Sequence, residues 1–212
     1  MPAPERTTLD AIVRAGRDVL EAEGLAGLTM QAVATRVGVR APSLYKRVAD
    51  RDELVRLVAA ATVGALAERL AAVPESADPR RDLAELAATL RSFARSAPAG
   101  YGLLFAPGPG AARPDPAQLA RASAPVLRVA AALAGPDDAL DAARTVTAWA
   151  HGFISMELAG AFALGGDVDD AFTYGIARIT DALASAGTDD PSIGTGARRQ
   201  ASMKARTASA TS

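Results

Sequence analysis

The chain contains no cysteine, and this absence excludes disulfide bridges, thiolate nucleophiles and cysteine-based zinc sites. Aromatic residues make up only 4% of the 212 residues, and no segment alternates Val, Ile, Thr and Tyr as a half-buried strand would. Alanine, the residue with the highest helix propensity, is abundant throughout. Half of the residues are apolar, so the chain can bury a core. We therefore predict an all-α protein.

Long uncharged apolar runs are also missing. The most apolar stretch, 57–73, is interrupted by Glu68 and Arg69, so it falls short of the roughly 20 apolar residues that a transmembrane helix needs. The first residues, Met-Pro-Ala-Pro-Glu-Arg, lack the apolar core of a signal peptide. We expect a soluble, cytoplasmic protein that has no membrane partner.

Neither sign of charge dominates, because 23 basic residues face 24 acidic ones and the net charge is −1. A nucleic-acid partner would therefore have to be recognised by a local concentration of charge. The window 24–49 contains no Asp or Glu, and its basic residues are Arg36, Arg40, Lys46 and Arg47. This window predicts a basic face on the folded protein. A solvated face without a partner is the simpler alternative.

Capping residues and glycines delimit the first helices. Thr7 can accept a hydrogen bond at the start of a helix over about 8–22, which Gly24 ends. Thr29 can cap a second helix, and Gly38 ends this helix after only about two turns. A helix this short buries little on its own, so its purpose lies elsewhere than in a core.

A third short helix follows at once. Pro42 suits the first turn of a helix over about 41–47, because its missing N–H would have no partner there. Gly38 can adopt the positive φ that a tight turn requires. Two short helices joined by such a turn, and packed behind a first helix, predict a homeodomain-like helix-turn-helix.

The rest of the chain predicts longer helices. Asp50 and Glu53 have the spacing of a capping box that opens a helix to Val73, and an amphipathic helix with Leu83 to Phe93 follows. Residues 98–102 break the helical pattern before a small apolar segment, 101–105. The remaining expected segments are a loop over 107–116, helices over 117–134, 137–164 and 168–186, and a disordered basic tail over 188–212.

The segment 28–54 resembles a known family. It reads LTMQAVATRVGVRAPSLYKRVADRDEL: a small-residue helix, a Gly-Val turn, Ser-Leu-Tyr and a charged cap. This order and spacing is similar to the DNA-binding signature of the TetR family of transcriptional regulators. The resemblance implies a helix-turn-helix domain over 1–50 and a helical domain for ligand binding and dimerisation over 51–187.

The resemblance also implies which residues contact DNA. Thr29 and Tyr45 would reach phosphates, and Arg51 stands where the family usually has a lysine near a phosphate. The implied groove-facing surface consists of Gln31, Arg40, Ala41, Pro42, Ser43, Lys46 and Arg47. Hydroxyls and Arg51 can position the protein on the DNA backbone, whereas Ser43, Lys46 and Arg47 can read base edges. Val48 replaces a common phenylalanine and Lys46-Arg47 an aromatic-His pair, so the operator sequence does not follow by analogy.

A second resemblance lies near the C-terminal end. The string AWAHGFISMEL at 148–158 resembles the WHG-type C-terminal domain of some TetR-like regulators, and YGLLF at 101–105 fits the segment before it. The resemblance implies a homodimer in which the last two helices of each copy form a four-helix bundle. It also implies an effector cavity among the fourth to eighth helices. The residues that we expect to line it are Leu90, Phe93, Tyr101, Leu104, Phe105, Trp149, His151, Phe153 and Met156.

Each of these lining residues has an alternative role. Apolar residues at helical spacing can be plain core, and His151, the single histidine, can be a hydrogen-bonded structural residue. Glu157 can form an interhelical salt bridge or anchor a ligand. We predict no catalytic residue, metal or cofactor, because the sequence shows no cluster of ligands, nucleophile pair or phosphate loop.

Three functional hypotheses follow from the sequence. We predict a repressor that a small apolar or aromatic effector releases from a palindromic operator; an activator is also compatible with the sequence, which does not report the sign of regulation. The second reading is an all-α small-molecule-binding dimer that does not bind an operator. The third is an enzyme in which His151 or Glu157 acts as a base, and we do not favour it.

Overall fold

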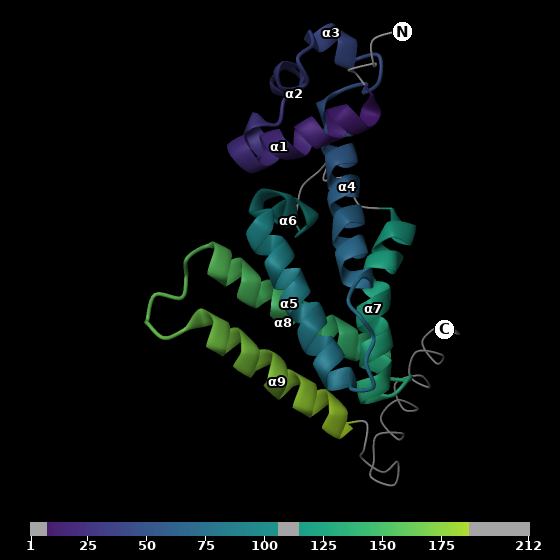
Figure 1. Cartoon of the computed structure of the whole chain (residues 1–212), viewed down its shortest axis with the longest axis vertical. Helices are drawn as coiled ribbons and strands as arrows, with labels where there is room; N and C mark the ends of the chain where they lie inside the picture. Colours follow the sequence, from purple (N-terminus) through teal and green to yellow (C-terminus); the bar gives the residue numbers. More distant parts are fainter. Residues whose placement is uncertain (1–7, 106–114, 187–212) are drawn as a thin grey trace, which may run out of the picture.

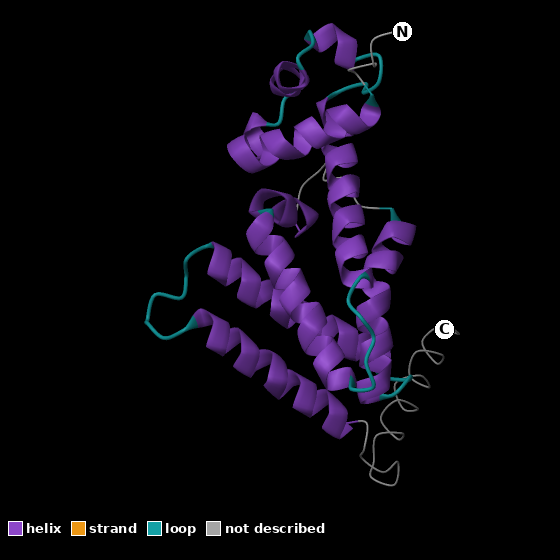
Figure 2. Cartoon of the chain, in the orientation of Figure 1, coloured by secondary structure: helices purple, strands orange, loops and turns teal. Residues whose placement is uncertain are grey.

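The computed structural model describes residues 8–105 and 115–186. These residues form helices and no strand, which confirms the all-α prediction (Figure 2). The expected tail over 188–212 and most of the expected loop over 107–116 lie outside them. No described helix is long and apolar enough to cross a membrane. The helices are α1 (Leu9–Gly27), α2 (Met30–Val37), α3 (Ala41–Leu44), α4 (Arg51–Ala71), α5 (Pro79–Ser96), α6 (Pro98–Phe105), α7 (Pro116–Ala134), α8 (Ala139–Leu158) and α9 (Val168–Ala186).

The first three helices pack on the N-terminal half of α4 around one apolar core. Figure 1 shows this unit at one end of the molecule, with α2 and α3 beyond α1. Burial of its apolar side chains stabilises the unit, since short helices contribute little stability on their own. The core residues with at most 1% exposure are Ile12, Leu20, Leu28, Val33, Ala34, Leu44, Val48, Leu54 and Val58.

Local capping contacts define the helix-turn-helix. The Thr29 hydroxyl accepts a hydrogen bond of 3.1 Å from the Ala32 N–H, and Gly38 ends α2 with a φ of 81°. A side chain at Gly38 would strain this left-handed conformation. Pro42 occupies the first turn of α3, as predicted, but the helix is shorter than 41–47 and continues as a turn after Leu44.

The ends of α1 differ in detail from the prediction. Thr8, not Thr7, caps the helix, because its hydroxyl accepts a hydrogen bond of 3.1 Å from the Ala11 N–H. The regular helix breaks at Gly24, as predicted, where φ is 70° and ψ is −177°. A further turn then extends to Gly27 before the chain enters α2.

Helix α4 belongs to both units of the molecule (Figure 1). It begins with the expected capping contacts: the Asp50 carboxylate accepts a 2.7 Å hydrogen bond from the Glu53 N–H, and the Glu53 carboxylate accepts one from the Ala49 N–H. Toward its other end, Leu66 and Leu70 belong to a second apolar core, which lies among α4 to α9. A continuous helix thus joins the helix-turn-helix to the rest of the chain.

The second unit is a bundle formed by the C-terminal half of α4 with α5 to α9. Figure 1 shows α8 and α9 as an antiparallel pair, joined by a loop that projects from the bundle. Large apolar and aromatic side chains from α4 to α9 fill the interior. The most buried of them are Leu83, Leu86, Phe93, Tyr101, Val129, Val146, Ile154, Phe172 and Ile176.

Two helix predictions in this unit were wrong. Residues 98–102 were expected to break the helical pattern, but α6 begins at Pro98, in the first turn where proline loses no hydrogen bond. Helix α8 ends at Leu158 rather than near residue 164, because Gly160 has a φ of 67°. The helices predicted over 117–134 and 168–186 are present as α7 and α9.

Helices α8 and α9 meet at an aromatic cluster. The ring centroids of Trp149 and Phe153 lie 5.4 and 5.2 Å from that of Phe172 on α9. A Cβ atom at Gly175 would lie 2.2 Å from the Trp149 indole. The indole of α8 therefore reaches the backbone of α9 because residue 175 has no side chain.

A buried ion pair adjoins this cluster. The Arg91 guanidinium of α5 donates two hydrogen bonds of 2.7 Å to the Glu157 carboxylate of α8, and it also lies 2.7 Å from the Asp169 carboxylate of α9. Only 7% of Arg91 is exposed, and its guanidinium lies 4.7 Å from the Phe172 ring centroid. Glu157 thus forms an interhelical salt bridge, one of its two expected roles, and three helices converge on one cation.

Candidate functional site

The turn after α3 presents polar side chains on the outer face of the helix-turn-helix. Leu44 and Val48 are fully buried, which turns the residues between them outward. Tyr45 is 55% exposed, and Lys46 and Arg47 are exposed as well. A recognition helix contacts DNA through its outward face. These three residues therefore lie where a DNA duplex could be bound.

The other residues expected at the DNA differ in their exposure. Arg40, Pro42 and Gln31 are exposed, whereas Ala41 and Ser43 are half-buried. The Thr29 hydroxyl already accepts the capping hydrogen bond of α2, so its proton is the group that can donate to a phosphate oxygen. These predicted DNA contacts thus lie on α3, beside it and at the start of α2.

Arg51 makes contacts that the sequence did not reveal. Its Nε donates a 2.8 Å hydrogen bond to the Leu28 carbonyl, and its Nη2 donates a 2.6 Å hydrogen bond to the Leu25 carbonyl. These bonds link the last turn of α1 and the residue after it to the first turn of α4. The residue is exposed, and its contact with a phosphate stays a prediction beside this positioning role.

The basic window is less uniform in the structure than in the sequence. Arg36 pairs with Asp18 of α1 at 3.2 Å, and both side chains are more than half exposed. An exposed pair of this kind contributes little stability, but it offsets the charge of Arg36. The positive charge near α3 comes from Arg40, Lys46 and Arg47.

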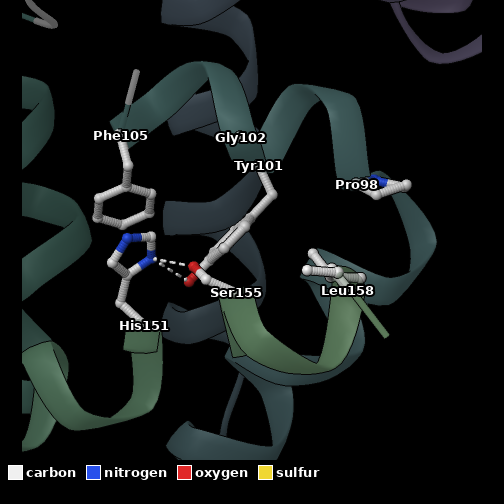
Figure 3. A pocket seen from close by; sticks show the side chains of 8 residues that line it. Pro98, Tyr101, Gly102, Phe105, His151, Ser155 and Leu158 are labelled. Carbon is white, nitrogen blue, oxygen red and sulfur yellow. Dashed lines mark hydrogen bonds between the residues drawn. The ribbon is translucent and has the colours of Figure 1, made fainter. Parts of the chain in front are cut away.

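A second candidate site is an open pocket of about 450 Å³ between α6 and the C-terminal half of α8 (Figure 3). The Tyr101 hydroxyl lies 3.1 Å from Nδ1 of His151, and the Ser155 hydroxyl lies 3.4 Å from the same nitrogen. Phe105 stacks on the imidazole with ring centroids 3.8 Å apart. The other lining residues are Pro98, Gly102, Leu158 and Ala159. The described lining is therefore aromatic and polar without a formal charge.

Only some of the residues predicted to line the effector cavity line this pocket. Tyr101, Phe105 and His151 line it, whereas Trp149 and Phe153 pack toward α9. Phe93 is buried in the core, Leu90 and Leu104 pack against that core, and Met156 is 49% exposed. Sequence reasoning did not select Pro98, Gly102, Ser155, Leu158 and Ala159. The spacing of four residues between His151, Ser155 and Ala159 places them on one helix face and could have indicated the last two.

Burial shifts the titration of two pocket residues. It lowers the pKa of His151 below its ordinary value of 6.5 and raises the pKa of Tyr101. At neutral pH the imidazole is therefore uncharged, so one ring nitrogen accepts and the other carries a proton. A neutral imidazole beside two hydroxyls favours an uncharged ligand that forms hydrogen bonds over a charged ligand. Among the described residues, no group of three His, Cys, Asp or Glu could hold a metal ion.

We expect the His151 ring protons to titrate with a midpoint below 6.5 in a proton NMR experiment. Because this is the single histidine, its resonances need no assignment. The unfolded chain binds the proton more tightly, so the fold loses stability as the pH falls from 6.5 toward the folded-state midpoint. The chain unfolded in urea should titrate near 6.5 as a control. A folded-state midpoint at or above 6.5 would contradict the buried environment.

Comparisons with known proteins identify the family of the chain. Residues 12–58 match the family model for bacterial regulatory proteins of the tetR family, and residues 83–179 match the tetracyclin repressor-like C-terminal domain. An HTH-type transcriptional regulator of Mycobacterium tuberculosis, itself uncharacterised, is 30% identical over 180 residues, which cover 83% of this chain and 81% of that protein. The chain belongs to the TetR family of transcriptional regulators. The DNA-binding role of its helix-turn-helix follows from this membership.

Solved structures share the fold of this TetR-family regulator. A Rhodococcus protein of unknown function has a TM-score of 0.69 and 25% identity, covering 87% of this chain and 100% of that one. Mycobacterium smegmatis BioQ has a TM-score of 0.60 and 25% identity, covering 85% and 99%. A variant of Acinetobacter baumannii TetR, in complex with minocycline, has a TM-score of 0.64 at 22% identity, covering 86% and 99%. The last likeness concerns the fold alone.

Proposed function

We propose that this TetR-family regulator is a repressor that binds a palindromic operator as a homodimer and releases it when a small apolar or aromatic effector binds. The observation that carries the proposal is the coexistence of an outward-facing α3 turn and a separate pocket between α6 and α8. Family membership accounts for DNA binding. Repression, dimerisation and the effector are the parts proposed here.

The surface around α3 supports operator recognition. Ser43, Lys46 and Arg47 stand on or next to the recognition helix, where side chains reach base edges in the major groove. Tyr45 and Thr29 carry hydroxyls that can donate to phosphates and so position the protein without reading sequence. A twofold dimer would place its two recognition helices about 34–36 Å apart, in successive major grooves.

Apolar side chains exposed on α8, α9 and their connection support the dimer. Exposed large apolar side chains that gather on one part of a protein are typical of protein interfaces. The two helices already form an antiparallel pair, and pairing with a second copy would complete a four-helix bundle. The exposed large apolar residues in this region are Leu140, Met156, Leu158, Phe162, Leu164 and Tyr174.

The pocket chemistry supports an uncharged effector with an aromatic part. Phe105 and His151 form a stacked pair on which a planar ring can lie, and Leu158 adds apolar surface. Tyr101 and Ser155 supply hydroxyls for one or two hydrogen bonds. A. baumannii TetR, which has the same fold, is known in complex with minocycline.

Release of DNA would be a population shift. An effector that binds better to a dimer with wider or tilted recognition helices would draw the protein into that state. Helix α6 is the natural intermediary, because it lines the pocket and also packs against α1 and α4. An effector with equal affinity for both states would release nothing.

The test is retardation of DNA from the region upstream of the regulator's own gene. The purified protein should retard this fragment at a lower concentration than a scrambled fragment of the same length and composition. Affinity should fall with salt, because bound phosphates release counterions. Equal affinity for both fragments would contradict operator recognition and favour a small-molecule-binding dimer. Mass spectrometry of compounds that co-purify would test the effector class.

A further inference from the structure

The carboxylate of Glu21 on α1 binds the first turn of α6. Helix α1 belongs to the DNA-binding unit, which consists of α1 to α3 and the N-terminal half of α4. Oε2 of Glu21 accepts a 3.0 Å hydrogen bond from the Ala99 N–H, and Oε1 accepts a 2.8 Å hydrogen bond from the Gly100 N–H. The N–H groups of a first turn have no partner within the helix and carry partial positive charge. Glu21 therefore satisfies two such groups and links α1 directly to α6.

Gly100 makes this approach possible. A Cβ atom at this position would lie 2.9 Å from Oε1 of Glu21 and 3.4 Å from Cγ2 of Thr62. The glycine is buried within α6 and is not among the residues with positive φ. Glycine is therefore not needed here for a turn. The absence of a side chain leaves space for the Glu21 carboxylate.

We propose that Glu21 is the positioning residue that couples the pocket to the DNA-binding unit. Helix α6 spans only Pro98–Phe105, and it lines the pocket with Tyr101 and Gly102 while its first turn binds Glu21. An occupant that displaces α6 must either move α1 with it or break both hydrogen bonds. Because α1 packs against α2 and α4, a shift of α1 changes the position of the helix-turn-helix relative to α4. This inference rests on the proposed function, in which an effector occupies the pocket.

The test uses a substituted side chain in place of an effector. A Cβ atom at Gly102 would meet nothing within 4 Å, so Gly102→Phe places a ring in the pocket without a clash at its base. The measurement is hydrogen–deuterium exchange of the α1 amides, residues 9–27, in the DNA-free full-length protein. In the wild-type background Gly102→Phe should change these exchange rates about fivefold, the lower range of typical couplings between sites.

Removal of the carboxylate should abolish this response. In a Glu21→Ala background, Gly102→Phe should leave α1 exchange unchanged, which is the signature of coupling in a double-mutant cycle. Gly100→Ala should act like Glu21→Ala, because its methyl group displaces only the flexible end of the Glu21 side chain. Glu23→Ala is the control, since it removes the same charge from an exposed position of the same helix.

The outcomes separate this proposal from the function on which it rests. An equal response to Gly102→Phe with and without Glu21 would overturn the coupling role, and so would no response in either background. Loss of the response in the Glu21→Ala and Gly100→Ala backgrounds, with its retention in Glu23→Ala, would support it. Failure of the wild-type protein to retard its upstream DNA would defeat the proposed function alone, because the exchange cycle contains no DNA.

Discussion

Replacement of Lys46 and Arg47 together by alanine is expected to weaken binding to the upstream DNA by about a hundredfold or more. Each good base contact is worth about 1–3 kcal/mol, and a factor of ten corresponds to about 1.4 kcal/mol. Both side chains are exposed in the turn after α3, whereas Leu44 and Val48 on either side are buried. Their removal should therefore leave the core intact. The measurement is a retardation or fluorescence-anisotropy titration.

The salt dependence of the same titration distinguishes the type of contact. If the two cations bind phosphates, the slope of log K against log salt should become shallower by about 0.9 for each lost contact. If they read bases, the slope should change little while discrimination against the scrambled fragment is lost. The matched control is Arg80→Ala with Arg81→Ala, an exposed basic pair at the start of α5. Unchanged binding by the Lys46/Arg47 variant would contradict recognition through this face.

Glu157→Ala should lower the free energy of unfolding by about 3 kcal/mol, because removal of one member of a buried ion pair leaves the other charge without compensation. Arg91 is only 7% exposed and would keep Asp169 as its remaining partner. That partner is well exposed, so it offsets only part of the loss. Equilibrium unfolding in urea, followed by circular dichroism, measures the change.

Two further variants calibrate this loss. Asp141→Ala removes an exposed carboxylate of the same helix, paired with Arg144, and should change stability by less than about 1 kcal/mol. Replacing both partners, as in Arg91→Met with Glu157→Leu, should cost less than Glu157→Ala because no buried charge is left unpaired. A Glu157→Ala loss no larger than that of Asp141→Ala would show that water reaches Arg91 freely.

The sequence predicts well those features that depend on neighbours in the chain. Thr29, Gly38 and the Asp50–Glu53 pair mark helix ends through contacts that span three or four residues, and the structure contains each of them. Periodicity likewise identified α5, and the segments predicted over 117–134 and 168–186 are the helices α7 and α9. The family signature added the DNA-binding role of α3, which no helix pattern alone specifies.

Features that depend on distant residues could not be predicted in the same way. Helix α6 contains Pro98 and two glycines, a composition that indicates a break, yet Glu21 of α1 supplies the missing partners of its first turn. Arg51 likewise donates to the Leu25 and Leu28 carbonyls at the end of α1, across more than twenty residues. The predicted aromatic face of α8 was divided, because α9 covers Trp149 while α6 covers His151.

The close approach of Trp149 to Gly175 has a practical consequence. The indole lies against the backbone of α9, and it is the single tryptophan of the chain. Its fluorescence therefore reports on one place alone, the seam between α8 and α9. Any rearrangement of that seam, whether on pairing with a second copy or on release of DNA, can be followed optically in the unlabelled, unmodified protein.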